Sequence, residues 1–277
     1  MKKTSIILSG GGMKSSYTVG MMQAISEKVD KENIDIIISS SASAPTGAYY
    51  ISDQMKDLRK FWESDVTLDG VVNMWRIWKV FDLKKVINVL LKGNNPLNEK
   101  RYKESRISHT VPVVSLKTGK MKYINAKKNG DIYKLLEDSE TLPGFTLIPD
   151  GSEEEYCDSH ATGFARIHLK KAIELGAEKV LIVTTVGSKF SIFWRDIYYN
   201  IWAFFKGKTF RKNYQRINKI KNKLIEHEGV EVFEIIPNPP LKIRLLENGK
   251  KVIKKSIKRG YDETIRNEKL FEFLNKD

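Results

Sequence analysis

Ile34-Asp-Ile-Ile-Ile-Ser-Ser-Ser-Ala-Ser-Ala-Pro-Thr-Gly-Ala-Tyr-Tyr50 is the stretch that decides the fold. A β-branched run passes through small residues into the start of a helix, which is the layout of a nucleophile elbow. Elbows of this kind read Gly-x-Ser-x-Gly, whereas here Ser39 and Ser43 stand at the glycine positions around Ser41. If φ is positive at either position, its Cβ costs ~1–2 kcal/mol. The stretch alone is therefore compatible with a working elbow or with an ordinary serine-rich turn.

Outward from this stretch, short β-branched runs alternate with helical patterns. We expect strands at Thr4–Leu8, Ile34–Ile38, Val111–Ser115, Met121–Ala126, Val180–Thr185 and Val230–Ile236. We expect helices at Tyr17–Val29, Thr46–Phe61, Leu83–Leu91 and Phe164–Leu175. This alternation predicts an α/β fold with a central, largely parallel sheet flanked by helices. We expect residues 1–186 to form the core, with a C-terminal extension, residues 187–277, packed on the same domain.

Length, charge and cysteine usage limit the possible classes of protein. The chain has 277 residues, a formal net charge of +14 and a pI of about 9.5, which favours anionic partners. Its one cysteine, Cys157, cannot form an internal disulfide, so a reducing, cytoplasmic location fits. The apolar run Ile6–Leu8 is too short for a signal peptide, and no stretch approaches the ~18 apolar residues of a membrane span.

The extension is basic and aromatic where it begins. Between Arg195 and Leu224 there are nine Lys or Arg residues and one acid, Asp196, and aromatic side chains precede most of the bases. An amphipathic helix at an anionic membrane surface has this composition, and so does a surface helix with solvated lysines. A second apolar and basic segment, Met74–Phe81, favours the membrane. No nucleic-acid motif accompanies the charge, so we do not expect a nucleic-acid partner.

A glycine turn follows the first predicted strand. Gly10, Gly11 and Gly12 free the backbone to turn tightly, and the helix that follows adds partial positive charge. Together these features predict a pocket for an anion, either a phosphate or the oxyanion of an acyl transfer. Walker A spacing fails because Met13 and Leu8 stand where glycines are required. The dinucleotide pattern fails at Ser15.

A serine nucleophile needs a base, and the histidines do not provide an obvious one. None of the four, His109, His160, His168 and His227, lies in a strong triad context. Asp158 is a different candidate, because it is expected in a loop between structured segments, where functional carboxylates tend to be held. A turn former or a helix cap is the alternative for Asp158.

These pieces, in this order, resemble the patatin-like phospholipase family. Its three motifs are Gly-Gly-Gly-x-Arg/Lys-Gly, Gly-x-Ser-x-Gly and Asp-Gly-Gly/Ala. Gly10-Gly-Gly-Met-Lys-Ser15 matches the first through Lys14, Ser39-Ser-Ser-Ala-Ser43 matches the second at Ser41, and Asp158-Ser-His160 matches the third at Asp158. The resemblance covers roughly residues 4–186, and serine replaces a family glycine at Ser15, Ser39, Ser43 and Ser159.

The resemblance implies a patatin-like sandwich and a lipid acyl hydrolase with a Ser–Asp dyad, of the phospholipase A, lysophospholipase or esterase type. Ser41 would attack the ester carbonyl and Asp158 would take its proton, without a histidine. The oxyanion hole would come from the turn formed by Gly10, Gly11, Gly12, Met13 and Lys14. The implied partner is a phospholipid or another acyl ester at a membrane surface, with no metal and no organic cofactor. The alternative is a catalytically silent relative that binds lipid or a protein partner.

Overall fold

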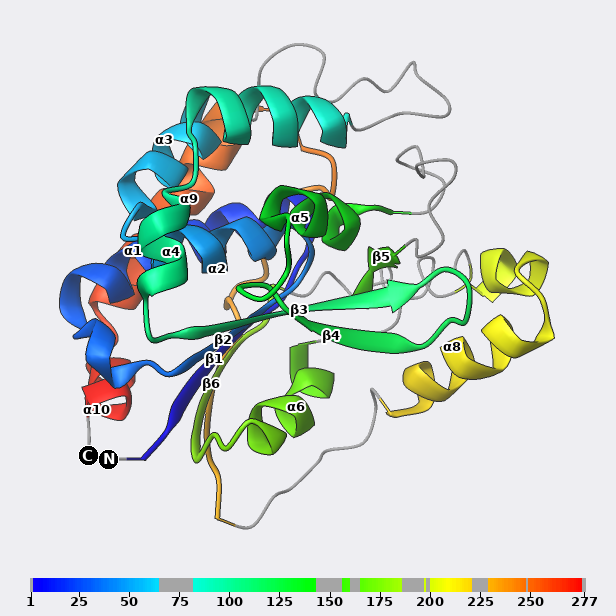
Figure 1. The fold of residues 1–277 in the computed structure, drawn as a ribbon. Helices are drawn as coiled ribbons and strands as arrows, with labels where there is room; N and C mark the ends of the chain where they lie inside the picture. The colour runs from blue at the N-terminus through cyan, green and yellow to red at the C-terminus, as the bar shows by residue number, and fades with distance from the viewer. Residues whose placement is uncertain are drawn as a thin grey trace.

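The fold is built on a seven-stranded sheet (Figure 1). The computed structural model describes residues 2–64, 82–142, 156–159, 165–185, 197, 200–220, 229–247 and 249–275. The strand order is β4-β3-β2-β1-β6-β7, and β5 pairs with β3 off this path. The parallel strands are β1 (Thr4–Leu8), β2 (Ile36–Ser39), β3 (Ser108–Ser115), β6 (Lys179–Val183) and β7 (Glu231–Ile235). Two strands, β4 (Met121–Asn125) and β5 (Tyr156–Asp158), run antiparallel to β3.

The predicted α/β class, with a largely parallel sheet flanked by helices, is confirmed. Each of the six predicted strands is present, with ends shifted by up to three residues. The strand β5 has no counterpart among the predicted strands, because three residues are too few to show a strand periodicity.

Helices cover both faces of the sheet (Figure 1). Larger helices pack on one face: α1 (Ser15–Lys28), α2 (Ala44–Ile51), α3 (Met55–Ser64), α5 (Ile132–Glu140), α9 (Lys250–Ile265) and α10 (Glu268–Asn275). The other face carries α6 (Leu169–Glu174), preceded by a 3₁₀ turn at Ala165–His168. Other helices in the described part of the chain include a π-helix at Lys85–Asn94, α4 (Glu99–Glu104) and α8 (Lys208–Ile220). No helix in these described ranges is long and apolar enough to cross a bilayer.

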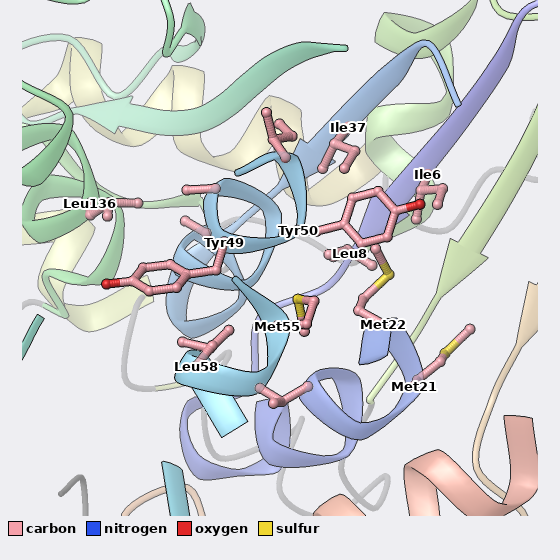
Figure 2. Packing of buried hydrophobic residues seen from close by; sticks show 14 of the residues in the cluster. Ile6, Leu8, Met21, Met22, Ile37, Tyr49, Tyr50, Met55, Leu58 and Leu136 are labelled. Atoms are coloured by element: carbon pink, nitrogen blue, oxygen red, sulfur yellow. The ribbon is translucent and has the colours of Figure 1, made fainter. Parts of the chain in front are cut away.

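Alternation along the strands divides the core between the two faces. In β1, Ile6 and Leu8 belong to the cluster beneath α1 and α2, whereas Ile7 belongs to the cluster beneath α6. This follows from the two-residue period of a strand. Figure 2 shows the larger cluster, with Met22 of α1 and Tyr50 of α2 near the strand side chains. The sheet is therefore buried on both faces, as its parallel strands require.

The predicted helix Thr46–Phe61 is two helices in the structure. Asp53, between α2 and α3, has φ +62°, in the left-handed region that interrupts a helix. The sequence pattern missed the break because both halves keep apolar residues toward the same core.

The C-terminal part of the chain completes the sheet and covers α1. β7 pairs in parallel with β6, and α9 crosses α1 at two glycines. A Cβ on Gly20 would overlap the Ile257 carbonyl, and one on Gly260 would overlap the Tyr17 carbonyl. Glycine at these two positions lets the helices approach closely. The proposed boundary at residue 187 stays a prediction.

Candidate active site

Ser41 lies on a strained turn between β2 and α2. The strand ends at Ser39, and a 3₁₀ turn at Ser41–Ser43 leads into the helix. Ser41 has φ +54°, and in the described part of the chain Asp53 is the one other non-glycine residue with positive φ. Such strain persists when the surroundings impose it, and it gathers at functional sites. The turn therefore presents Ser41 as a nucleophile elbow does.

The serines at the elbow's glycine positions do not carry this strain. Ser43 has φ −94°, and Ser39 is a regular residue of β2. The penalty considered for a Cβ at positive φ thus does not apply to either. The strained residue of this elbow is Ser41 itself.

Both added hydroxyls have hydrogen-bond partners. The Ser43 hydroxyl donates to the Ser9 carbonyl at 2.7 Å, tying the elbow to the end of β1. The Ser39 Oγ lies 2.7 Å from His109 Nε2, and the other ring nitrogen lies 2.7 Å from the Tyr102 hydroxyl. Burial lowers the pKa of His109 to about 3, so its ring is neutral and has one donor and one acceptor nitrogen.

This hydrogen-bonded group (Ser39, His109 and Tyr102) supports the elbow from beneath. Gly47 of α2 gives it room, because a Cβ there would lie 2.9 Å from His109 Nε2. His109 does not line the pocket at Ser41. Its role is to hold the end of β2.

The glycine turn lies against the elbow. Gly11 and Gly12 have φ +151° and +55°, conformations that L side chains rarely adopt. A Cβ on Gly10 would overlap the Ser41 Cβ and come within 3.0 Å of its Oγ. The turn therefore passes directly beside the candidate nucleophile.

Thr185, just beyond the end of β6, anchors the turn. Its hydroxyl donates to the Gly10 carbonyl at 2.8 Å, and its N–H donates to Ser9 Oγ at 2.9 Å. A Cβ on Gly11 would approach Thr185 Oγ1 to 2.8 Å. Thr185 cannot be recognised from the sequence, because a threonine after a strand has no local pattern that indicates this contact.

The backbone N–H groups of the glycine turn differ in whether they already donate a hydrogen bond. The Met13 N–H donates to the Leu245 carbonyl at 3.0 Å, so in this conformation it is not available to an oxyanion. Among the described residues, the Gly11 and Gly12 N–H groups have no hydrogen-bond acceptor. Burial lowers the pKa of Lys14, whose side chain is half-buried behind the turn. Gly11 and Gly12 are thus the turn's candidate oxyanion donors.

Asp158 lies at the end of β5, in a strand rather than in the expected loop. Along one edge of β3, β4 is the partner strand. The other edge pairs first with β2 and then, beyond the end of β2, with β5, where Asp158 is opposite Val113. β2 pairs with that same edge up to Thr110, where its partner is Ile38. Asp158 and Ile38 are thus three β3 residues apart, about 10 Å along the strand.

Ser39, Ser40 and Ser41 continue from β2 into this interval. The topology therefore brings Ser41 and Asp158 to the same edge of β3, at facing strand ends. Asp158 is buried, and its N–H donates to the Thr141 carbonyl at 2.9 Å. His160 and His227, and much of the extension's aromatic cluster, lie outside the described residues. The assignment of Ser41 and Asp158 as a dyad stays a prediction.

An apolar pocket of about 630 Å³, counting the part open to solvent, adjoins Ser41. Gly12, Leu245 and Glu140 also line it, and its wall is made by hydrophobic side chains that include Phe61, Trp62, Leu83, Val86, Leu91 and Leu142. The pocket suits an acyl chain better than a phosphate, because little polar surface faces it.

Glu140, at the end of α5, is the one acidic residue of this pocket among the described residues. Its Oε1 is buried and has no hydrogen-bond partner in the described part of the chain. Burial, followed by the charges of Asp158 and Glu137, raises the pKa of Glu140 to about 8. Glu140 is therefore mostly protonated at neutral pH and lies near Asp158. Sequence reasoning missed it, because a glutamate at a helix end is usually solvated.

The other candidate side chains lie apart from the pocket. Burial lowers the pKa of His168 to about 3, and His168 contacts Tyr123. Cys157 is buried, and burial raises the pKa of its thiol, so it is a packing residue and not a reactive thiolate. Neither lines the pocket at Ser41.

Comparison with models of protein families gives a match. The family model described as patatin-like phospholipase matches residues 6–159, more than half of the chain. Comparison with curated proteins gives no match. Among solved structures, VipD from Legionella pneumophila is similar over 99% of this chain and 67% of its own, with 11% sequence identity and a TM-score of 0.46.

Proposed function

Since this chain belongs to the patatin-like phospholipase family, we propose that it is a serine acyl hydrolase acting on lipid esters at a membrane surface. The substrate would be a phospholipid or a related acyl ester, and the protein would act as a cytoplasmic, peripheral membrane enzyme. The observation that carries the proposal is the strained turn that aims Ser41, at φ +54°, between a glycine turn and an apolar pocket.

The proposed reaction has two steps. The Ser41 hydroxyl attacks the ester carbonyl carbon while Asp158 takes its proton. Collapse of the tetrahedral intermediate breaks the ester C–O bond, and the alcohol leaves with the proton from Asp158. Water then attacks the acyl-serine with Asp158 as base, which releases the fatty acid and restores the Ser41 hydroxyl.

The glycine turn would supply the stabilisation of the intermediate. Its Gly11 and Gly12 N–H groups have no acceptor among the described residues, and the turn passes beside the Ser41 side chain. Preorganised donors of this kind are a large term in acyl transfer, since losing one costs ~10²–10³ in kcat. The apolar wall of the pocket would hold the acyl chain while the reacting ester lies at its polar end.

A second candidate is a lipid-binding relative without activity. It is favoured by one specific observation, the donation of the Met13 N–H to the Leu245 carbonyl at 3.0 Å. A carbonyl at the turn partly fills the place where an oxyanion would otherwise collect donors. The two candidates differ in whether Ser41 reacts.

Labelling with a serine-reactive fluorophosphonate probe tests the proposal. We expect wild type to label and Ser41→Ala and Asp158→Asn to lose labelling, while Ser26→Ala, an exposed serine on α1, labels like wild type. Wild type and Ser26→Ala should also release fatty acid from phospholipid vesicles, whereas Ser41→Ala and Asp158→Asn should not. If folded wild type labels no better than Ser41→Ala, the hydrolase proposal fails and the inactive relative is the better account.

A further inference from the structure

A helical hairpin at residues 200–216 forms a surface that the proposed reaction does not use. Residues 200–205 are helical, Gly207 turns the chain at φ +96°, and α8 follows. We call these residues the docking hairpin. Figure 1 shows α8, in yellow, at the edge of the molecule beyond the β3–β4 turn.

The inner side of the docking hairpin is fixed to the body of the protein. Ala203, Phe210 and Tyr214 are buried together, and Trp202 packs both on them and on a second buried cluster formed by Val114, Leu116 and Cys157. The Asn213 side chain donates to the Thr118 carbonyl of the β3–β4 turn at 2.8 Å. These contacts hold the hairpin against the body of the protein. They therefore fix which of its side chains face outward.

That outer side is apolar at its tip. Ile201, Phe204 and Phe205 are 56%, 60% and 80% exposed. They are three of the six large hydrophobic side chains that are exposed among the described residues, and they lie within five positions of one another. Contiguous exposed apolar side chains indicate a binding surface rather than ordinary surface composition.

The charged residues of the docking hairpin itself are all basic. Residues 200–220 contain no acid, and the exposed bases are Lys206, Lys208, Arg211, Lys212 and Arg216. Two of them stand beside aromatic rings, Arg211 at 5.2 Å from the Phe204 ring and Lys206 at 5.9 Å from the Trp202 ring. Aromatic and aliphatic side chains bordered by cations match the boundary between acyl chains and anionic headgroups.

The docking hairpin also adjoins the pocket. Leu142 packs against its buried cluster and lines the pocket at Ser41. Trp202 also packs on the buried cluster of Val114, Leu116 and Cys157, and Cys157 directly precedes Asp158. A surface that holds the hairpin would therefore lie next to the site where an acyl chain is proposed to enter.

We propose that the docking hairpin binds an anionic lipid bilayer, with Ile201, Phe204 and Phe205 inserted among the lipids and the bases on the headgroups. The inference deepens the proposed function and rests on it in one respect only, in treating the docked bilayer as the source of substrate. Binding itself does not require hydrolysis.

Vesicle sedimentation tests the docking directly in a Ser41→Ala background, where no hydrolysis is expected. The vesicles are phosphatidylcholine alone or phosphatidylcholine with about 30 mol % phosphatidylglycerol, an anionic lipid. We expect binding to the anionic vesicles, weaker binding to phosphatidylcholine, and weaker binding at high salt. Phe204→Ser/Phe205→Ser should weaken binding by at least about 10-fold, and Lys206→Gln/Lys208→Gln/Arg211→Gln by about 100-fold.

The matched control variants make the same types of substitution at exposed positions outside the docking hairpin. Val232→Ser/Ile236→Ser alters two exposed hydrophobic side chains near β7, and Lys251→Gln/Lys254→Gln/Lys255→Gln removes three exposed bases of α9. Both should bind anionic vesicles within about 2-fold of the parent. Equal losses in the controls, or full binding by both hairpin variants, would overturn the inference. Hairpin-dependent binding to an oligonucleotide but not to vesicles would also overturn it.

The enzyme assays separate this inference from the proposed function. With Ser41 intact, Phe204→Ser/Phe205→Ser should hydrolyse a short soluble ester at the normal rate and vesicle lipid at least about 10-fold more slowly. If the active-site serine never reacts but the hairpin still binds vesicles, the proposed function fails and the docking surface stands. If hydrolysis is normal and the hairpin substitutions leave vesicle binding unchanged, the docking surface fails and the proposed function stands.

Discussion

Gly10 and Ser41 meet at the carboxyl ends of two neighbouring strands, with no space for a side chain between them. β1 and β2 are paired in register up to Leu8 and Ser39, so the turns that follow them start side by side. A Cβ on Gly10 would overlap the Cβ of Ser41. The conformation of the glycine turn and the position of the candidate nucleophile are therefore coupled.

Gly10→Ala should displace Ser41 or the glycine turn. An error of about 1 Å can cost ~100-fold in rate, so we expect fluorophosphonate labelling at least about 10-fold slower than wild type. Gly130→Ala is the control, because nothing lies within 4 Å of a Cβ there. Normal labelling by folded Gly10→Ala would show that the two turns are not coupled.

Ser39→Ala should lower the free energy of unfolding by about 1–3 kcal/mol, because it leaves buried His109 Nε2 without its partner. Urea denaturation measures the change, and Ser26→Ala, on an exposed helical face, should stay within about 0.5 kcal/mol of wild type. A Ser39→Ala protein as stable as wild type would mean that the Ser39–His109 hydrogen bond contributes nothing net.

The sequence predicted the parts of the site whose signals are local. The strand before Ser41, the glycine turn and Asp158 each have a short pattern, and their order indicated the family. The contacts among these parts have no such pattern. Ser39 and His109 are 70 residues apart, and the acceptor of the Met13 N–H is a backbone carbonyl, which every residue has. The serine substitutions at the elbow became interpretable only when φ was known at Ser41 and Ser43.

The short strand β5 shows the same limit for the fold. Three residues give no periodicity, so Asp158 was expected in a loop. Its place is set by pairing with Val113, in space that exists because β2 ends before β3 does. Parallel strands of five residues were predictable from their apolar runs, whereas this pairing depends on where two other strands end.

Glu140 should make stability depend on pH. Its pKa is about 8 in the folded protein and near 4.5 when exposed, so the folded state keeps a proton that the unfolded chain releases between those values. The stabilisation that comes from the raised pKa of Glu140 is fully present below pH 4.5. It declines as pH rises from 4.5 toward 8 and is absent above pH 8. Glu140→Gln removes the titrating group, so its stability should vary less across this window.

We expect the melting temperature of wild type to fall by at least about 4 °C more than that of Glu140→Gln between about pH 5 and pH 8.5, since one pKa unit is ~1.4 kcal/mol and ~1 kcal/mol shifts melting by roughly 2–4 °C. Glu268→Gln, at an exposed position of α10, should melt in parallel with wild type. Parallel melting curves for Glu140→Gln and wild type would contradict a protonated Glu140.

Thr185→Val should slow the reaction of Ser41 while preserving the fold. Valine keeps the shape of threonine but leaves the Gly10 carbonyl without the donor that now lies at 2.8 Å, so the glycine turn loses an anchor. Thr184→Val is the matched control. The buried Thr184 hydroxyl donates to Glu234 Oε1 at 3.2 Å, away from the glycine turn. Thr184→Val loses one hydrogen bond, whereas Thr185→Val loses the bond to the Gly10 carbonyl and the 3.2 Å contact of its hydroxyl with Ser9 Oγ, so we expect losses of about 1–2 kcal/mol of stability. A displacement of a few tenths of an ångström at the turn should cost Thr185→Val about 10-fold in kcat with KM unchanged, because the turn is proposed to bind the transition state. Equal kcat values for the two variants, measured on a soluble ester, would show that Thr185 contributes to stability alone.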